Sequence, residues 1–202
     1  MKSLLALPCL YDLAQYAMRG TRYRRHLAEH HLRVAPGERV LDIGCGTGAM
    51  LECLPQSVPP VEYVGLDMSP AYLAAARRHY GSRGAFHCVE LTPDTVADFG
   101  QFDQVLAIGL IHHLDDAAAT NLFHLAQRAL RPGGRLITLD GVFTGNQSWL
   151  VRFLLKSDQG KYVRTEPAYR VLATGVFGQV RTFVAHDLFR IPYTNLIMEC
   201  TP

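Results

Sequence analysis

The sequence is short of the features that mark disulfide-rich, zinc-binding and membrane-spanning proteins. Its 202 residues include five cysteines, an odd number without a Cys-x-x-Cys pair, which argues against a disulfide framework and a zinc site. No stretch approaches the roughly 18 to 20 apolar residues that a membrane span requires. The apolar run at the N-terminus is interrupted by Pro8 and Asp12 before it reaches signal-peptide length. These absences suit a reducing compartment, and we expect the protein to be cytoplasmic.

The sequence also lacks a large excess of either sign of charge. The formal net charge is +2 and charged residues make up 19% of the chain. No basic run is interleaved with aromatic residues, so nucleic-acid binding has no electrostatic footprint. Hydrophobic residues make up 49%, enough for one domain with a proper core. Composition therefore gives no support to a nucleic-acid partner, and the oligomeric state is left open.

What the sequence does contain is a regular alternation of short apolar runs and helical patterns. Strands are predicted at 39–43, 61–67, 85–89, 102–110 and 135–139. Helices are predicted at 71–80, where Ser69 and Pro70 supply a cap and a first helical residue, and at 116–130. Five strand–helix alternations of this kind predict a parallel, doubly wound α/β sheet with helices on both faces.

The two ends of the chain depart from this alternation. Residues 3–32 show helical spacing of apolar residues. After the fifth strand, 149–155 is predicted to be helical and 156–170 to be a polar loop. Residues 177–185 and 196–200 are predicted to form a closing β-hairpin.

The most informative segment is the glycine-rich turn after the first strand. Gly44, Gly46 and Ala49 satisfy the dinucleotide pattern G-x-G-x-x-G/A, which alone is weak. Asp42 argues against a dinucleotide, because its carboxylate would lie near a bound pyrophosphate. The same carboxylate is favourable beside a ligand that carries an ammonium and a sulfonium group. A nicotinamide-dependent oxidoreductase remains an alternative, although no Tyr-x-x-x-Lys is present.

Four segments in order resemble the motifs of class I S-adenosylmethionine-dependent methyltransferases. They are VLDIGCGTG (40–48), GLDMS (65–69), FDQVLAIGLIHHL (102–114) and LRPGGRL (130–136). The resemblance implies a Rossmann-like seven-stranded sheet of order 3-2-1-4-5-7-6 with strand 7 antiparallel. It implies S-adenosyl-L-methionine as cofactor and S-adenosyl-L-homocysteine as product. It also implies that Asp67 binds both ribose hydroxyls and that Glu90 and Leu91 lie near the adenine. The other residues expected at the cofactor are Asp42, Gly44, Cys45, Gly46, Met68, Ile108 and Tyr11.

The resemblance also divides the chain. We expect a single methyltransferase domain over 1–202, with an N-terminal helical lid (1–35) and a cofactor-binding core (36–140). An acceptor-side insertion (141–175) and the closing hairpin (176–202) complete it. The predicted reaction is methyl transfer to a small-molecule O, N, S or C nucleophile. A non-catalytic module that binds the cofactor and supports a partner subunit remains an alternative.

Residues for the chemistry follow the fourth strand and the fifth. His113 matches the position of a histidine that acts in phosphoethanolamine-type methyltransferases, but it could equally anchor its loop by hydrogen bonding. His112 is expected to line the acceptor pocket, together with Tyr162 and Arg164 of the later loop. No metal is expected, because adjacent histidines point in different directions and Asp140 is followed by Gly141 where metal-dependent relatives carry an Asp-Asn pair. The sequence does not identify the acceptor.

Overall fold

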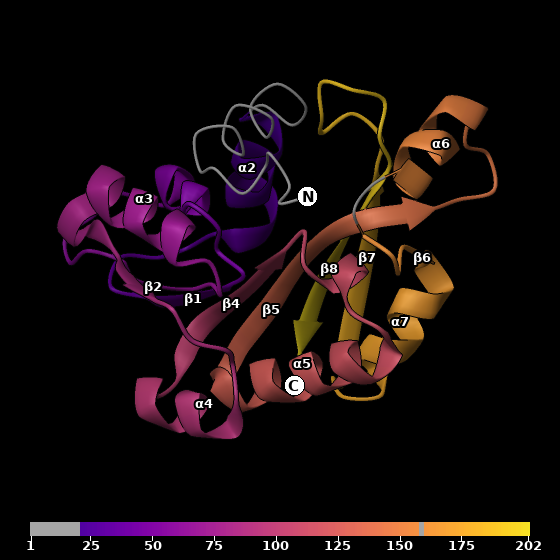
Figure 1. The fold of residues 1–202 in the computed structure, drawn as a ribbon. Coiled ribbons are helices and arrows are strands. Elements are labelled where there is room, and N and C mark those ends of the chain that lie inside the picture. The colour runs from indigo at the N-terminus through magenta and orange to yellow at the C-terminus, as the bar shows by residue number, and fades with distance from the viewer. Residues whose placement is uncertain (1–20, 158–159) are drawn as a thin grey trace.

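The computed structural model describes residues 21–157 and 160–202, and a single twisted sheet lies at its centre (Figure 1). The strands follow the order β3-β2-β1-β4-β5-β8-β7, and β6 pairs with β5 outside this path. Strands β3, β2, β1, β4 and β5 run parallel, whereas β8 is antiparallel to both β5 and β7. The strands are β1 (Arg39–Ile43), β2 (Glu62–Leu66), β3 (Ala85–His87), β4 (Phe102–Ile108), β5 (Leu130–Phe143), β6 (Arg164–Thr165), β7 (Gln179–Ala185) and β8 (Asn195–Thr201).

This topology confirms the predicted sheet. Strands β7 and β8 are the sixth and seventh strands of the prediction, and β8 is the antiparallel one. The numbering differs because β6, a two-residue strand that was not predicted, pairs with Val142 and Phe143 at the end of β5. Strand β5 is also longer than predicted, and it continues past the end of β4 to finish beside α6 (Figure 1).

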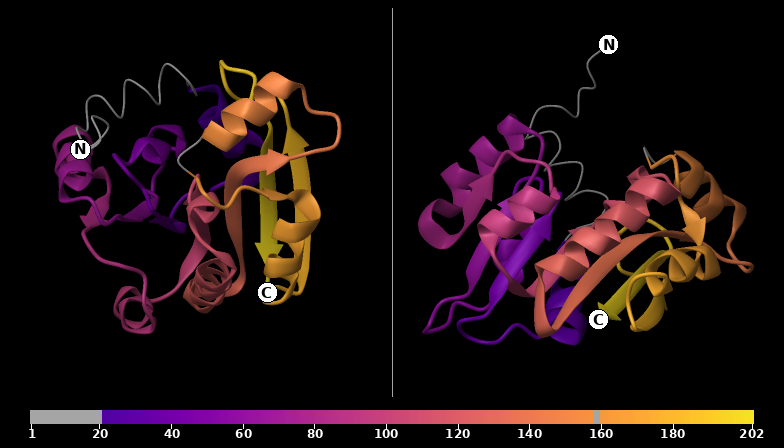
Figure 2. Two further views of the ribbon diagram at one scale, coloured as in Figure 1. Left: turned by 45° about the vertical axis from the view of Figure 1, so that its right-hand side comes forward. Right: turned by 90° about the horizontal axis from the view of Figure 1, so that it is seen from below.

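Helices cover both faces of the sheet (Figure 2). One face packs against α4, α5 and α7, and the other against α2, α3, α6 and the short helices η2 and η3. The α-helices are α2 (Arg22–Leu27), α3 (Pro70–Tyr80), α4 (Pro93–Phe99), α5 (Asp116–Ala129), α6 (Trp149–Ser157) and α7 (Glu166–Thr174). The shorter helices are η2 (Ala28–Leu32), η3 (Ala49–Cys53), η4 (Gly81–Arg83) and η5 (Ile111–His113).

Local sequence explains where these helices begin. The Ser69 hydroxyl accepts a hydrogen bond from Tyr72 N–H, and Pro70 opens α3 as predicted. Thr92 and Thr95 form a capping box at α4, a helix that was not predicted. The Asp115 carboxylate accepts from Ala118 N–H and caps α5.

The prediction of a loop over 156–170 was wrong in its second half, which contains β6 and the start of α7. Pro167 lies in the first turn of α7, where its missing N–H costs nothing. Thr165, Pro167 and Ala168 are exposed, while Tyr169 and Ala173, four residues apart, are fully buried. A helix with so narrow an apolar stripe reads as a loop when only polarity is considered. The helix after β1 is a 3-10 helix.

The described part of the N-terminal segment packs on the sheet. Leu27 and Leu32 are completely buried, and the Tyr23 ring meets Phe189 edge-on at 5.6 Å between centroids. The first twenty residues of the predicted lid (1–35), Tyr11 among them, lie outside the described residues. Among the helices of residues 21–157 and 160–202, none has the length and apolar character needed to cross a bilayer.

Candidate active site

The glycine turn joins β1 to η3 at the carboxyl edge of the sheet. Gly44, Gly46 and Gly48 have φ angles of 71°, 57° and 78°, in the left-handed region that side chains disfavour. At Gly48 an added Cβ would also lie 2.7 Å from Phe86 Cε1. The backbone of this turn can therefore approach a ligand closely, as the sequence predicted.

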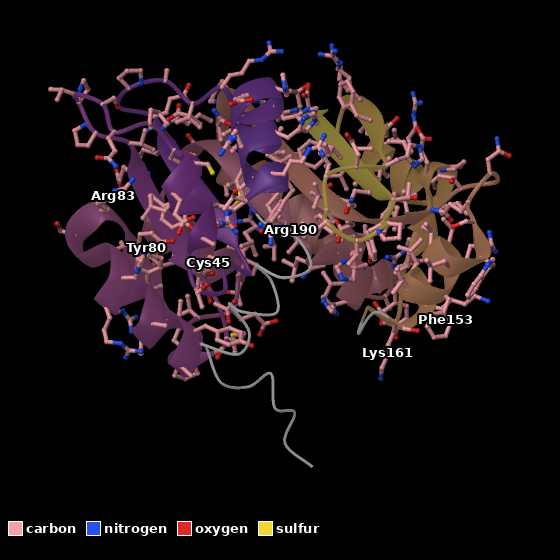
Figure 3. The ribbon with its side chains drawn as sticks, turned by 90° about the horizontal axis from the view of Figure 1, so that it is seen from above. Cys45, Tyr80, Arg83, Phe153, Lys161 and Arg190 are labelled. Atoms are coloured by element: carbon pink, nitrogen blue, oxygen red, sulfur yellow. The ribbon has the colours of Figure 1, made fainter. Side chains whose placement is uncertain are left out.

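The turn is fastened to the end of β2. The N–H groups of Gly44 and Cys45 both donate to the Leu66 carbonyl, at 2.8 and 3.0 Å. Cys45 Sγ occupies the space beside Gly65, where an added Cβ would lie 2.8 Å from the sulfur. Burial raises the pKa of the Cys45 thiol far above its usual value, so this side chain fills space and is no nucleophile at neutral pH. Figure 3 shows Cys45 between the α3 side, marked by Tyr80 and Arg83, and the α6 side, marked by Phe153 and Lys161.

Asp67 holds the first two cofactor motifs together. One oxygen of its carboxylate, Oδ2, accepts from Gly46 N–H at 2.9 Å, and Oδ1 accepts from Ser69 N–H at 2.8 Å. Each oxygen keeps a further lone pair, and the side chain is partly exposed at the edge of the sheet. A carboxylate fixed in this way suits the two adjacent hydroxyls of a ribose.

Asp42 lies beneath this turn and is 2% exposed. The Tyr63 hydroxyl donates to Asp42 Oδ2 at 2.6 Å. Burial raises the pKa of Asp42 to about 7; the Tyr63 hydrogen bond opposes this rise and the charge of Asp67 adds to it. Asp42 near the end of β1 and Asp67 after β2 place two carboxyl groups at the same edge of the sheet, which favours a ligand with positive charge. The residues present therefore fit S-adenosylmethionine, which carries a sulfonium and an ammonium group.

The pKa of Asp42 leads to a prediction about stability and binding. A carboxyl group whose pKa is raised on folding stabilises the fold at low pH, and this contribution is lost as pH rises through the folded value. The free protein is therefore expected to lose on the order of 4 kcal/mol between about pH 4 and pH 8, from a pKa that rises from 3.8 to about 7. Asp42→Asn, which still accepts from Tyr63, is expected to raise the melting temperature of the free protein at pH 8.

The same substitution is expected to weaken binding of the cationic cofactor, most strongly above pH 7. Circular dichroism melts from pH 5 to 9 and calorimetry with S-adenosylmethionine measure the two effects. Asp98→Asn, an exposed aspartate on α4, is the matched control. A melting temperature below that of the wild type at pH 8 would contradict this account of Asp42.

The remaining residues predicted to contact the cofactor lie along the same edge. The Met68 side chain is 65% exposed after β2, Leu91 is buried after β3, and Ile108 ends β4 half-buried. Glu90 is exposed, and its carbonyl accepts from the Thr95 hydroxyl. Tyr11 is outside the described residues. The contacts of these residues with the cofactor stay predictions.

A buried histidine–aspartate pair lies where β4 and β5 end. His112, in η5, is 2% exposed and Asp140, on β5, is 3% exposed. Asp140 Oδ1 lies 2.7 Å from His112 Nδ1 and also accepts from the His112 backbone N–H at 3.1 Å. His112 Nε2 and Asp140 Oδ2 are buried without a hydrogen-bond partner. Asp140 was not predicted to lie in the site, although its position on β5 just beyond the end of β4 is the sequence signal that points to it.

Residues 160–162 lie against His112. An added Cβ at Gly160 would fall 1.9 Å from His112 Cδ2 and 3.0 Å from Nε2, so only glycine fits here. Tyr162 N–H donates to the His112 carbonyl at 2.9 Å, and the Tyr162 side chain is 42% exposed. This segment therefore covers the edge of His112 that carries Nε2.

Arg164 fastens that segment to the start of α5. Its guanidinium donates to Asp116 Oδ1 through Nε and Nη2, at 2.9 and 2.7 Å. It also donates to the carbonyl oxygens of Ile111, Leu114 and Tyr162. All five N–H groups of the guanidinium have a protein acceptor. Arg164 was predicted to contact the acceptor; the described contacts make it a clamp between two loops.

His113, the predicted catalytic residue, is exposed beside this pair. The ring centroid of His113 lies 4.2 Å from that of His112. The backbone N–H of His113 donates to the Leu110 carbonyl. Both of the roles considered for His113 stay predictions. Within the described ranges, no three or more of the His, Cys, Asp and Glu side chains come together as a metal site.

Comparison with known proteins agrees with this geometry. Residues 41–136 match the model of a family described as the methyltransferase domain. The chain is 36% identical over 103 residues to the ubiquinone biosynthesis O-methyltransferase of Pseudomonas aeruginosa, covering 50% of this chain and 43% of that protein. It is 37% identical over 123 residues to the demethylmenaquinone methyltransferase of Thermus thermophilus, covering 59% of this chain and 54% of that protein. The chain thus spans about half the length of these curated relatives.

A solved structure extends the likeness to nearly the whole fold. Phosphoethanolamine N-methyltransferase 2 of Haemonchus contortus, in complex with phosphomonomethylethanolamine and S-adenosylhomocysteine, superposes with a TM-score of 0.71 at 18% identity. The superposition covers 96% of this chain and 57% of that one. The sheet order is that of the Rossmann-like methyltransferase fold, and residues 41–136, a little under half of the chain, match the methyltransferase domain. This match favours a methyltransferase fold over a nicotinamide-dependent oxidoreductase.

Proposed function

We propose that this protein transfers the methyl group of S-adenosylmethionine to an acidic group, such as a hydroxyl, of a small molecule, and that His112 removes the proton. The observation that carries the proposal is the buried pair of His112 and Asp140, with Nε2 unpartnered. It lies at the carboxyl ends of β4 and β5, beyond the predicted cofactor residues of β1 and β2.

The geometry selects the tautomer of the neutral imidazole. An ionised carboxylate only accepts hydrogen bonds, so Asp140 Oδ1 accepts a hydrogen bond from His112 Nδ1–H. Nε2 then carries the free lone pair. The backbone N–H of His112 donates to the same oxygen, and this second contact fixes the carboxylate against the ring. Asp140 thus acts as a positioning residue, and His112 is the proposed base.

Bound S-adenosylmethionine supplies a methyl group activated by its positive sulfur. The protein has to orient the acceptor in line with the methyl–sulfur bond. As the acceptor oxygen forms its bond to the methyl carbon, its proton passes to Nε2 of His112. The electrons of the broken carbon–sulfur bond remain on sulfur, and the product thioether is neutral. The imidazolium that results is stabilised by the carboxylate of Asp140, until it loses the proton to solvent.

Access to Nε2 depends on the 160–162 segment. Gly160 packs against the ring, so an acceptor reaches the nitrogen when this backbone moves aside. We propose that the exposed ring of Tyr162 contacts the acceptor as it enters. In this proposal Arg164 acts on the acceptor indirectly, by setting the position of the loop.

The names of both curated relatives refer to quinone compounds. This supports an acceptor related to a quinol, whose hydroxyl is acidic. Cys45, Cys53, Cys88 and Cys200 are free thiols, which supports a reducing compartment such as the cytoplasm. The chain is proposed to act as one functional unit over 1–202, without nucleic acid.

Labelled methyl transfer tests the proposal. The full chain is incubated with S-adenosylmethionine carrying a tritiated methyl group and with a panel of phenols and quinols, and label in the organic phase is counted. Calorimetry in parallel compares S-adenosylmethionine with NAD. We expect micromolar binding of the first, none of the second, and transfer that rises with the acidity of the acceptor hydroxyl. Tight NAD binding without S-adenosylmethionine binding would overturn the assignment.

A further inference from the structure

Helix α6 presents large apolar side chains to solvent. The fractional exposures are 78% for Trp149, 58% for Phe153 and 40% for Leu150. Leu155 on the opposite side is completely buried, and Val151 and Leu154 pack against the same core cluster. The helix is therefore anchored by one face, while its outer face remains more apolar than solvent contact alone would favour.

Basic residues share this outer face. Residues 149, 152, 153 and 156 follow helical spacing, so Arg152 and Lys156 flank the two aromatic side chains. No acidic residue occurs between 143 and 157. Lys161 lies on the same side of the molecule as Phe153 (Figure 3), and it is exposed. The two charged side chains within α6, Arg152 and Lys156, are both basic, and the first acidic residue after the helix in the sequence is Asp158.

We infer that the outer face of α6, made of Trp149, Leu150, Arg152, Phe153 and Lys156, docks on the surface of an anionic lipid bilayer. Tryptophan, phenylalanine and leucine with flanking lysine and arginine are the composition of helices that lie in the membrane interface. Each basic residue near an anionic leaflet adds further attraction. Tryptophan, phenylalanine and arginine are also enriched at protein interfaces, but lysine is depleted there, so Lys156 favours the anionic bilayer over a protein partner.

The location of α6 suggests a role for membrane docking in acceptor uptake, and this role rests on the proposed function. Helix α6 follows β5 and precedes the segment that covers His112. A bilayer against α6 would therefore face the side from which an acceptor reaches His112. The inference is that the acceptor is a lipid-soluble molecule taken up from the membrane surface.

Trp149 is the only tryptophan of the chain and serves as the probe. The full chain is mixed with vesicles of phosphatidylcholine, alone or with phosphatidylglycerol, without cofactor or acceptor. With the anionic vesicles we expect a blue shift of the tryptophan emission, co-sedimentation, and release by salt. With phosphatidylcholine alone we expect little blue shift and little co-sedimentation.

Variants distinguish docking through α6 from nonspecific adsorption to the vesicles. Phe153→Ser is expected to lower vesicle affinity by roughly tenfold or more, and Arg152→Gln with Lys156→Gln by a similar factor. Val171→Ser removes an apolar side chain that is 70% exposed on α7, away from α6, and is expected to leave binding unchanged. Circular dichroism melts confirm that each variant is folded.

Three outcomes would overturn the inference. They are absence of a blue shift and of co-sedimentation with anionic vesicles, equal binding by Phe153→Ser and wild type, and a blue shift that appears without vesicles as protein concentration rises. The last would assign the face to a second copy of the chain. Because no methyl transfer is measured, failure here leaves the proposed reaction standing, and loss of the reaction leaves the docking result standing.

Discussion

Replacing His112 with asparagine is expected to lower kcat by about 10²- to 10⁴-fold, the range of acid–base groups, with cofactor affinity close to that of wild type. The asparagine amide N–H can take the place of Nδ1–H at Asp140, so the buried carboxylate keeps a donor. Nothing in the variant replaces Nε2. The loss of rate should ease at high pH, where an acidic acceptor ionises without help. Single-turnover rates from pH 6 to 10 measure both effects.

Two companion variants identify the role of each residue of the pair. His124→Gln removes an exposed histidine from α5 and is expected to have no effect. Asp140→Asn removes the charge that favours the imidazolium, so its kcat should fall and its pH–kcat profile should move to lower pH. An unchanged profile with a lower melting temperature would mean that Asp140 is only structural. Wild-type turnover in His112→Asn, with a large loss in His113→Gln, would transfer the role of base to His113.

Asp67→Ala is expected to weaken binding of S-adenosylmethionine by roughly 10²- to 10⁴-fold, because hydrogen bonds to a charged acceptor contribute about 1.5–3 kcal/mol each. Two such bonds to a ribose are lost. The variant also frees the N–H groups of Gly46 and Ser69, which Asp67 now holds at 2.9 and 2.8 Å. Calorimetry with S-adenosylhomocysteine measures the change, and Asp98→Ala is the control on an exposed helix.

A second ligand separates the ribose contact from the anchoring of the loop. For the wild type, an analogue of S-adenosylhomocysteine without the two ribose hydroxyls should bind as weakly as the natural ligand binds to Asp67→Ala. For Asp67→Ala itself, removal of those hydroxyls should change little. If the variant still discriminates between the two ligands as the wild type does, Asp67 does not bind the ribose.

The sequence was sufficient for the cofactor half of the molecule because its signals there are local. Each glycine of the turn adjoins the strand that it follows, and Ser69 with Pro70 starts α3 a few residues after β2. Hydrophobic runs between such markers were enough to locate the strands, and the resemblance supplied their order in the sheet. Asp67 could be placed at the carboxyl edge because it follows a parallel strand, and its contact with the ribose stays a prediction.

The acceptor half could not be predicted to the same depth because its contacts join distant residues. His112 and Asp140 are 28 positions apart and pair only because β4 and β5 are neighbours in the sheet. Arg164 is separated from Asp116 by 48 positions, and no local pattern marks it as a clamp. The burial of Asp42 under Tyr63 also depends on the β1–β2 register, so its raised pKa could not be foreseen.

The clamp made by Arg164 has a consequence for substrate selection. A single side chain ties the backbone over His112 to the first turn of α5. On the proposed function, an acceptor that displaces Gly160 moves backbone four residues from Arg164, so the ion pair with Asp116 resists the displacement. The free energy of opening this junction would then contribute to the choice of acceptor. Two acceptors of equal size and acidity would be distinguished by how far each one forces the junction apart.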